Sequence, residues 1–192
     1  MKAKNIVLVI VIVCIVGFAG YLAGTRSKVG PSKANQTAQQ RTTAGSFSAG
    51  NQPIDFDEIL SELKARLAEN PNDGELHARL GDVYFGMQRF DEAIGYYKKA
   101  IELNPDDVDS YNDMGLSYHY KGNTVEGLKF INEGIAKNPY YQRIWLTKGF
   151  LLAYGLGNRK EATEAWQKAV TLDPDSPVGK AANAYLEEFT KK

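Results

Sequence analysis

Prolines and glycines recur at an almost constant interval in this chain of 192 residues. The interval is 34 residues, and it lengthens once to 35. The recurring residues are Pro71, Pro105, Pro139 and Pro174, together with Gly81, Gly115 and Gly149. A period of this length is typical of helix-turn-helix units, which cannot bury their apolar faces alone and must stack on copies of themselves. The sequence therefore predicts an all-α solenoid.

The period divides the chain after residue 73 into three copies. They cover residues 74–107, 108–141 and 142–176, and the third is one residue longer. We expect the extra residue in the segment Gly155-Leu156-Gly157-Asn158, between the two helices of copy three, because a longer surface loop costs little.

Matching positions of the three copies carry bulky, small, aromatic and proline residues. Copy one has His77, Leu80, Gly81, Tyr84, Ala93, Tyr97, Ala100 and Pro105; copy two has Tyr111, Met114, Gly115, Tyr118, Gly127, Ile131, Gly134 and Pro139; copy three has Trp145, Lys148, Gly149, Leu152, Ala162, Trp166, Ala169 and Pro174. This pattern resembles the tetratricopeptide repeat family over residues 74–176. The resemblance implies paired helices that approach closely at the small residues and a concave face that binds another protein.

Copy two departs from the pattern at two positions. Gly127 and Gly134 stand where alanine is usual, and each should cost roughly 1 kcal/mol of helix propensity. We therefore predict that the helix near residues 125–137 is the least stable inside the solenoid, and that it is not the helix best protected from hydrogen exchange.

Both ends of the repeat array are expected to be capped. Residues 55–70 have apolar side chains at helical spacing and read as a lone second helix of an incomplete repeat. Ser176 and Pro177 suit the cap and the first turn of a helix over 177–190. The folded domain then covers residues 54–192, with about eight helices and no strands.

The front of the chain has a different composition. Residues Ile6 to Ala23 carry no charge and are long enough to span a bilayer as a helix. We favour a transmembrane signal anchor over residues 1–25, although Gly17-Phe18-Ala19 would also suit a signal-peptidase cleavage site. The short segment before the span places the domain outside the cytoplasm. We therefore expect a single-pass protein of the bacterial inner membrane with a periplasmic domain; cations on both sides of the span leave the reversed orientation open.

Residues 26–53 read as a flexible linker between the anchor and the domain. They are rich in Ser, Thr, Gly, Ala, Gln and Asn and have too few apolar residues to offset the entropy of ordering. All 23 acidic residues follow Pro53, where 17 cations accompany them, so that the domain has a net charge of −6. An acidic domain argues against nucleic acid as a partner.

Residues that could carry chemistry are sparse. The chain has one cysteine, Cys14, and two histidines, His77 and His119, with no partner at metal-ligand spacing. No nucleophile–base arrangement or phosphate-binding loop is recognisable. We therefore expect no enzyme activity, no cofactor and no metal site.

The family resemblance also implies which residues line the concave face. They lie at fixed positions of the first helix of each copy. The predicted peptide-binding groove consists of Asp82, Phe85, Asn112, Leu116, His119, Tyr120, Arg143, Leu146, Phe150 and Tyr154. Buried aromatic residues with a polar rim suit a protein or peptide partner.

The order of anchor, linker and repeats is similar to that of membrane-anchored tetratricopeptide subunits of bacterial cytochrome c maturation. That resemblance implies apocytochrome c or an assembly complex as the partner. Two alternatives stay open, namely a scaffold that organises an envelope complex by self-association and an adaptor that faces the cytoplasm.

Overall fold

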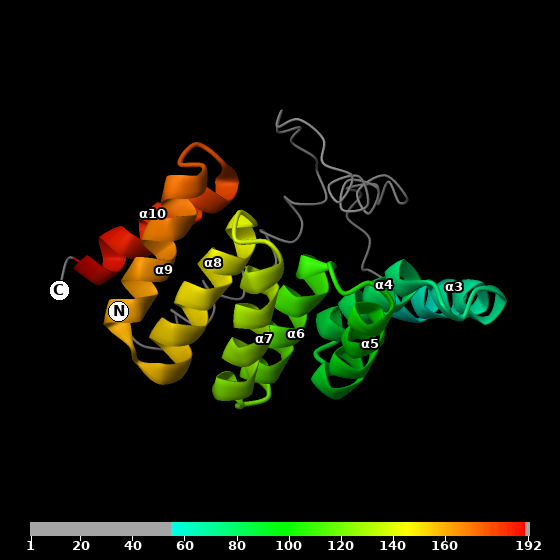
Figure 1. The fold of residues 1–192 in the computed structure, drawn as a ribbon. Coiled ribbons are helices and arrows are strands. Elements are labelled where there is room, and N and C mark those ends of the chain that lie inside the picture. Colours follow the sequence, from blue (N-terminus) through cyan, green and yellow to red (C-terminus); the bar gives the residue numbers. More distant parts are fainter. Residues whose placement is uncertain (1–54, 191–192) are drawn as a thin grey trace. The chain divides into compact units, whose positions relative to one another are not determined.

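A computed structural model describes residues 55–190 of the chain, and these residues form eight α-helices and no strand (Figure 1). The all-helical prediction is thus confirmed for this part of the chain. The predicted anchor and linker, residues 1–25 and 26–53, lie outside the described residues. The helices are α3 (Phe56–Glu69), α4 (Gly74–Gly86), α5 (Phe90–Leu103), α6 (Val108–Tyr120), α7 (Thr124–Lys137), α8 (Gln142–Phe150), α9 (Arg159–Leu172) and α10 (Pro177–Thr190). Within residues 55–190, no helix has both the length and the apolar character that a membrane crossing requires.

The helices begin and end where local signals dictate. Helices α4, α6 and α8 begin at Gly74, Val108 and Gln142, which are the first residues of the three copies. The second helix of each copy stops just before an Asn-Pro or Asp-Pro pair, because proline disfavours the helical conformation of the residue before it. The Ser176 hydroxyl accepts a hydrogen bond from the Gly179 amide at 2.8 Å, so that the predicted cap of α10 is present.

The extra residue of copy three lies mainly in a widened helical turn. Helix α8 continues into a π-helical segment, η1 (Leu151–Gly155), before the chain turns into α9. In copies one and two, the residue before the second helix donates to a carbonyl five residues back, as Asn123 does to Tyr118 at 2.9 Å. In copy three, Asn158 donates to Leu152 at 2.8 Å, six residues back. Our placement of the insertion at 155–158 was therefore about one turn too late, because a π turn absorbs the residue without opening the loop.

The helices form two layers with different contacts. Figure 1 shows the pairs α4–α5, α6–α7 and α8–α9 side by side along the stack. The first helices touch in series, α4 with α6, α6 with α8 and α8 with α10. Among the described helices, the second helices α5, α7 and α9 make no contact with one another. The stack therefore curves with the first helices on its inner side.

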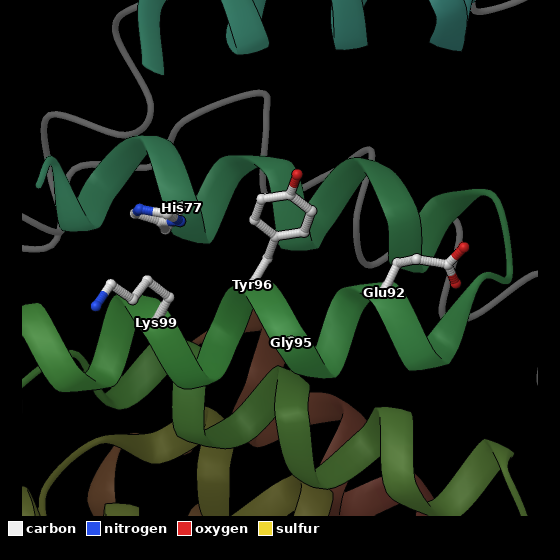
Figure 2. Close-up of a pocket in the computed structure, with 5 residues that line it drawn as sticks. All are labelled: His77, Glu92, Gly95, Tyr96 and Lys99. Carbon is white, nitrogen blue, oxygen red and sulfur yellow. The ribbon is translucent and has the colours of Figure 1, made fainter. Parts of the chain in front are cut away.

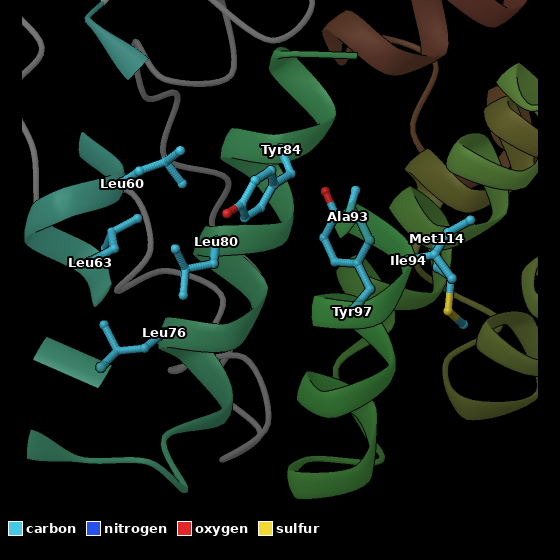
Figure 3. Close-up of a cluster of buried hydrophobic side chains, with 9 residues drawn as sticks. All are labelled: Leu60, Leu63, Leu76, Leu80, Tyr84, Ala93, Ile94, Tyr97 and Met114. Atoms are coloured by element: carbon cyan, nitrogen blue, oxygen red, sulfur yellow. The ribbon is translucent and has the colours of Figure 1, made fainter. Parts of the chain in front are cut away.

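The core runs between the layers. In the first cluster, the Tyr97 ring from α5 lies against Gly81 of α4, and leucines of α3 close the end (Figure 3). A β-carbon at Gly81 would lie 2.6 Å from the ring of Tyr97, so that only glycine allows this approach. The residues of this cluster are Leu60, Leu63, Leu76, Leu80, Tyr84, Ala93, Ile94, Tyr97 and Met114.

The two unusual glycines of copy two sit at close helix contacts. A β-carbon at Gly127 of α7 would lie 2.5 Å from the carbonyl oxygen of Gly115 on α6. One at Gly134 would lie 2.5 Å from Ile144 and 2.8 Å from Tyr111. Both residues are buried. The loss of helix propensity thus permits a backbone-to-backbone approach at Gly127, and at Gly134 it makes room for the side chains of Ile144 and Tyr111.

Candidate functional site

A continuous row of aromatic side chains crosses the first-helix layer. We call it the aromatic row; its members are Phe85, Phe90, His119, Tyr120, Phe150, Tyr154, Tyr185 and Phe189. Phe85 of α4 meets Tyr120 of α6 edge to face, with ring centroids 5.8 Å apart. His119 meets Phe150 in the same way at 5.4 Å, and Phe150 meets Tyr154 at 5.1 Å. The row thus links copy one to the C-terminal helix.

The members of the row differ in exposure. Phe150 is 7% exposed and belongs to the core, whereas Tyr120 is 37% exposed. Phe85 and Tyr154 are half-buried. The row therefore combines rings that hold the helices together with rings that a partner can touch.

Three members of the row were not among the predicted groove residues. Phe90 opens the second helix of copy one and stacks on Tyr120 at 5.4 Å. Tyr185 and Phe189 lie on α10, which covers the predicted capping helix, and both contact Tyr154. Since α10 packs on α9 and α8 as a first helix of a further copy would, extending the repeat positions into 177–190 would have found both.

Arg143, a predicted groove residue, instead joins two first helices through charge. Its guanidinium donates to Asp109 at 3.0 Å and to Asp113 at 2.6 Å, both on α6. The Tyr141 hydroxyl also donates to Asp109. Burial lowers the pKa of Arg143, but Asp113, Tyr141 and Asp109 outweigh that effect and hold it well above its ordinary value. The network fixes copy two to copy three.

Asp82 and Asn112 complete this polar region. The Tyr97 hydroxyl donates to Asp82 at 2.9 Å, and burial together with that carboxylate raises the pKa of Tyr97 well above its ordinary value. Asn112 is fully buried, and its amide nitrogen donates to Asp113 at 2.9 Å. We call Asp82, Asp109, Asn112, Asp113 and Arg143 the polar cluster.

The remaining predicted residues lie between these two groups. Leu116 is half-buried on α6. The Leu146 carbonyl accepts a hydrogen bond from the Trp166 indole at 3.2 Å, and its side chain packs against a core cluster made of Leu152, Ala162, Trp166, Ala169 and Ala182. His119 has its Nδ1 atom 2.9 Å from the Thr124 hydroxyl, and burial lowers its pKa. Burial disfavours the charged imidazolium, so His119 serves the row as a neutral ring.

A shallow depression of about 310 Å³ lies between α4 and α5 (Figure 2). Figure 2 shows His77 of α4 beside Tyr96 and Lys99 of α5. His77 is buried, as expected for a packing residue, and its Nε2 atom donates to the Pro71 carbonyl at 3.0 Å. No predicted groove residue lines this depression; its lining is His77, Glu92, Gly95, Tyr96 and Lys99.

No group that could hold a metal ion, with three or more His, Cys, Asp or Glu side chains, occurs within residues 55–190. The two surfaces that the first helices provide are therefore a row of rings and a cluster of charges.

Comparison with known proteins agrees with the repeat pattern. Residues 81–122 match a family model described as "TPR repeat", and residues 142–176 match one described as "Tetratricopeptide repeat". Neither is an enzyme family. The chain is also 28% identical over 120 residues to "Hsp70-Hsp90 organizing protein 3" of Arabidopsis thaliana, a match that covers 62% of this chain and 21% of that protein. The chain thus spans about a fifth of this relative's length.

Solved structures show the same fold at lower sequence identity. "Crystal structure of MamA" superposes with a TM-score of 0.58 at 18% identity, covering 85% of this chain and 95% of that one. "First TPR of Spaghetti (RPAP3) bound to HSP90 peptide SRMEEVD" superposes with a TM-score of 0.55 at 19% identity, covering 62% of this chain and 90% of that one. From the two family matches and the shared fold, we conclude that this chain contains tetratricopeptide repeats, matched over residues 81–122 and 142–176.

Proposed function

We propose that this protein binds a peptide or a helix of another protein on the first-helix layer. The aromatic row carries this proposal, because it places rings from three copies and α10 along the inner side of the curve. Aromatic side chains are frequent at the energetic centre of protein interfaces, where a large ring brings much apolar area at little entropic cost. Tyr120 is the most exposed of the large apolar residues in the row.

The relatives support the same class of function. One similar domain was solved with the HSP90 peptide SRMEEVD, and one relative is named for organising Hsp70 and Hsp90. Some family members grip such acidic tails with lysine and asparagine, but Ala78 and Asp82 stand at those positions here. We therefore infer that this chain has the family's mode of binding with a different partner.

The test is capture of partners from intact cells by crosslinking, with wild type, Tyr120→Ala and Tyr140→Ala compared. Tyr140 is 77% exposed in the turn between α7 and α8, lies outside the row and loses the same atoms in its variant. We expect Tyr120→Ala to lose the captured proteins and Tyr140→Ala to retain them. Equal capture by all three proteins would contradict the proposal. Phe150→Ala is unsuitable because deleting a buried phenylalanine costs about 3–5 kcal/mol of stability.

We further propose that the chain is attached to a membrane and that its repeats face the periplasm. The support is the uncharged stretch from Ile6 to Ala23, which is long enough to span a bilayer as a helix. A cysteine at Ser46 should react with a membrane-impermeant thiol reagent in spheroplasts. Protection until the membrane is permeabilised would instead mean that the repeats face the cytoplasm.

The narrowest form of the proposal is a role in cytochrome c maturation, which the layout of the chain supports. In that case the captured proteins should include apocytochrome c. Sedimentation of the purified protein separates this function from a self-associating scaffold, which would form concentration-dependent oligomers without any partner.

A further inference from the structure

Neighbouring copies meet at a recurring contact near the end of each first helix. At the junction of copies one and two, Tyr120 of α6 packs against Phe85 and Phe90 of copy one, with ring centroids 5.8 and 5.4 Å apart. At the end of the array, Phe189 of α10 packs in a similar way against the Arg159 guanidinium, which lies 4.7 Å from the ring centroid. A ring therefore fills each of these two junctions.

The junction of copies two and three has no such ring. Gly155 is the residue that corresponds to Tyr120 once the extra residue of copy three is counted. A β-carbon at Gly155 would lie 3.0 Å from Nδ1 of His119 and closer still to the side chain of Thr124. The backbone of η1 thus closes directly on His119 and Thr124, which occupy the places that the two phenylalanines have in copy one.

His119 is both the imidazole at this junction and a member of the aromatic row. Its Nδ1 atom is 2.9 Å from the Thr124 hydroxyl, and Thr124 is buried. Its ring meets Phe150 of α8 edge to face, with the centroids 5.4 Å apart. The aromatic row passes from copy two to copy three through this ring contact, so that the state of His119 affects the row and the junction together.

The surroundings of His119 offer nothing that would stabilise a positive charge on its ring. The groups packed against it are the Tyr120 phenol on α6, the Thr124 hydroxyl on α7, the Phe150 ring on α8 and the backbone of Gly155 on η1. Phenols stay neutral in mildly acidic solution. Charged side chains of the nearby turns pair with one another, Lys121 with Asp91 and Glu126 with Lys129. Among residues 55–190, burial alone shifts the pKa of His119, and it lowers that pKa.

We propose that the junction of copies two and three is a pH-sensitive joint, which is closed while His119 is neutral and loosens when the ring takes up a proton. A charged ring requires water that the closed junction withholds, so protonation favours an arrangement in which η1 and the start of α7 move apart. The joint is a property of this chain alone. Its consequence for binding rests on the proposed function, because an open joint divides the aromatic row that a partner would contact.

The pH dependence of the joint follows from the burial of the ring. The open joint exposes His119 and gives it the ordinary histidine pKa, whereas the closed joint lowers that pKa. The open form therefore binds a proton more readily, and its population rises as the pH falls from the ordinary value through the lowered one. A partner that covers the row would bury the ring further and should be released over the same pH interval.

Hydrogen exchange of the full chain in detergent, read by mass spectrometry, tests the joint without any partner. Exchange is compared at about pH 7.5 and about pH 5, which bracket the ordinary titration of histidine, after correction for the intrinsic exchange rate at each pH. We expect opening of the segments with residues 119–124 and 151–158 to increase by at least about threefold at the lower pH. The segment with residues 84–90, at the junction of copies one and two, contains no histidine and should not change.

His119→Gln is the decisive variant. Glutamine can form a hydrogen bond with the Thr124 hydroxyl but does not titrate, so that the increase at the lower pH should disappear. The matched control is His77→Gln, an identical change at a histidine of α4 that donates to the Pro71 carbonyl, and it should keep the increase. Gly155→Ala should open the joint already at the higher pH, because its β-carbon would clash with Thr124.

Four outcomes would overturn the joint. They are unchanged exchange of its two segments at the lower pH, an equal increase at both junctions, an equal increase in His119→Gln and wild type, and loss of the increase in His77→Gln as well. The first two need only the wild-type protein, so that a variant that fails to fold does not remove the test. If Tyr120→Ala retains the captured proteins while the joint opens as expected, the proposed function is overturned and the joint stands.

Discussion

The same substitution, glycine to alanine, should have opposite effects on stability at two helical positions of this protein. Gly95 lies exposed inside α5, and a β-carbon added there meets no atom within 4 Å. Gly127 lies buried inside α7, and a β-carbon there meets the Gly115 carbonyl oxygen at 2.5 Å. The pair therefore isolates the contribution of helix packing from that of helix propensity.

At Gly95 the substitution changes helix propensity and creates no new packing contact. Alanine is favoured over glycine in a helix interior by roughly 1 kcal/mol, and it also reduces the entropy of the unfolded chain. Gly95→Ala should thus stabilise the protein by about 1 kcal/mol, which raises the melting temperature by about 3–5 °C for a domain of this size.

At Gly127 the same gain of about 1 kcal/mol is opposed by a clash with the backbone of α6. An ordinary van der Waals contact begins near 3.4 Å, about 0.9 Å more than this distance, so that helices α6 and α7 must move apart to accept the β-carbon. A carbonyl oxygen cannot rotate away as a side chain can, and overpacking of this kind costs about 1–3 kcal/mol. We expect Gly127→Ala to be destabilising by up to about 2 kcal/mol net.

Urea unfolding followed by far-UV circular dichroism measures both variants against wild type. If the midpoint urea concentration shifts while the slope of unfolding free energy against urea concentration stays the same, the substitution has changed stability alone. A Gly127→Ala protein that is as stable as Gly95→Ala would refute the reasoning, because it would show that α6 and α7 do not approach as closely as described.

Two further predictions concern the turn and the buried imidazole. Gln88 has a φ of 59°, and Gly122 occupies the equivalent turn position of copy two with a φ of 84° and open space around it. Because glycine adopts positive φ without strain, Gln88→Gly should stabilise the protein and Gly122→Gln should destabilise it. Each change should amount to up to about 1 kcal/mol in urea unfolding. Burial lowers the pKa of His119, so the unfolded chain binds a proton more readily than the folded one, and stability is lost as the pH falls from the ordinary histidine pKa to the lowered one. His119→Gln should remove that part of the pH dependence; parallel stability curves for the variant and wild type across the mildly acidic range would contradict it.

The repeat period and the prolines that end the second helices could be recognised from the sequence alone. Pro105 and Pro139 mark the helix ends, because proline acts locally and needs no knowledge of the rest of the fold. The pairing of helices followed from the period, since each copy must bury its apolar face on the next.

Features that depend on two helices at once were harder to predict. The propensity argument at Gly127 considered one helix and could not see the carbonyl of Gly115 facing it. It still predicts that α7 is the least stable helix inside the solenoid, which hydrogen exchange can test. The π segment was also missed, because an insertion in a sequence does not reveal which backbone turn absorbs it.

The aromatic residues of the candidate site were easier to predict from the sequence than its charged contacts. Family positions pointed to Phe85, Tyr120 and Tyr154, and these side chains do join one row. The same positions gave Arg143 as a groove residue without its partners, because Asp113 faces it from another copy, 30 residues away in sequence. Pairing between distant charges is a property of the assembled stack.

The nearest-neighbour character of the stack has a mechanical consequence. Among the helices that the structure describes, α3 contacts α4 alone, whereas each internal helix contacts neighbours on both sides. Tension applied at residue 55 would therefore detach α3 first and expose the leucines at its contact with α4, while the following helix pairs stay folded. A protein built in this way yields to a pull in steps, one hairpin after another.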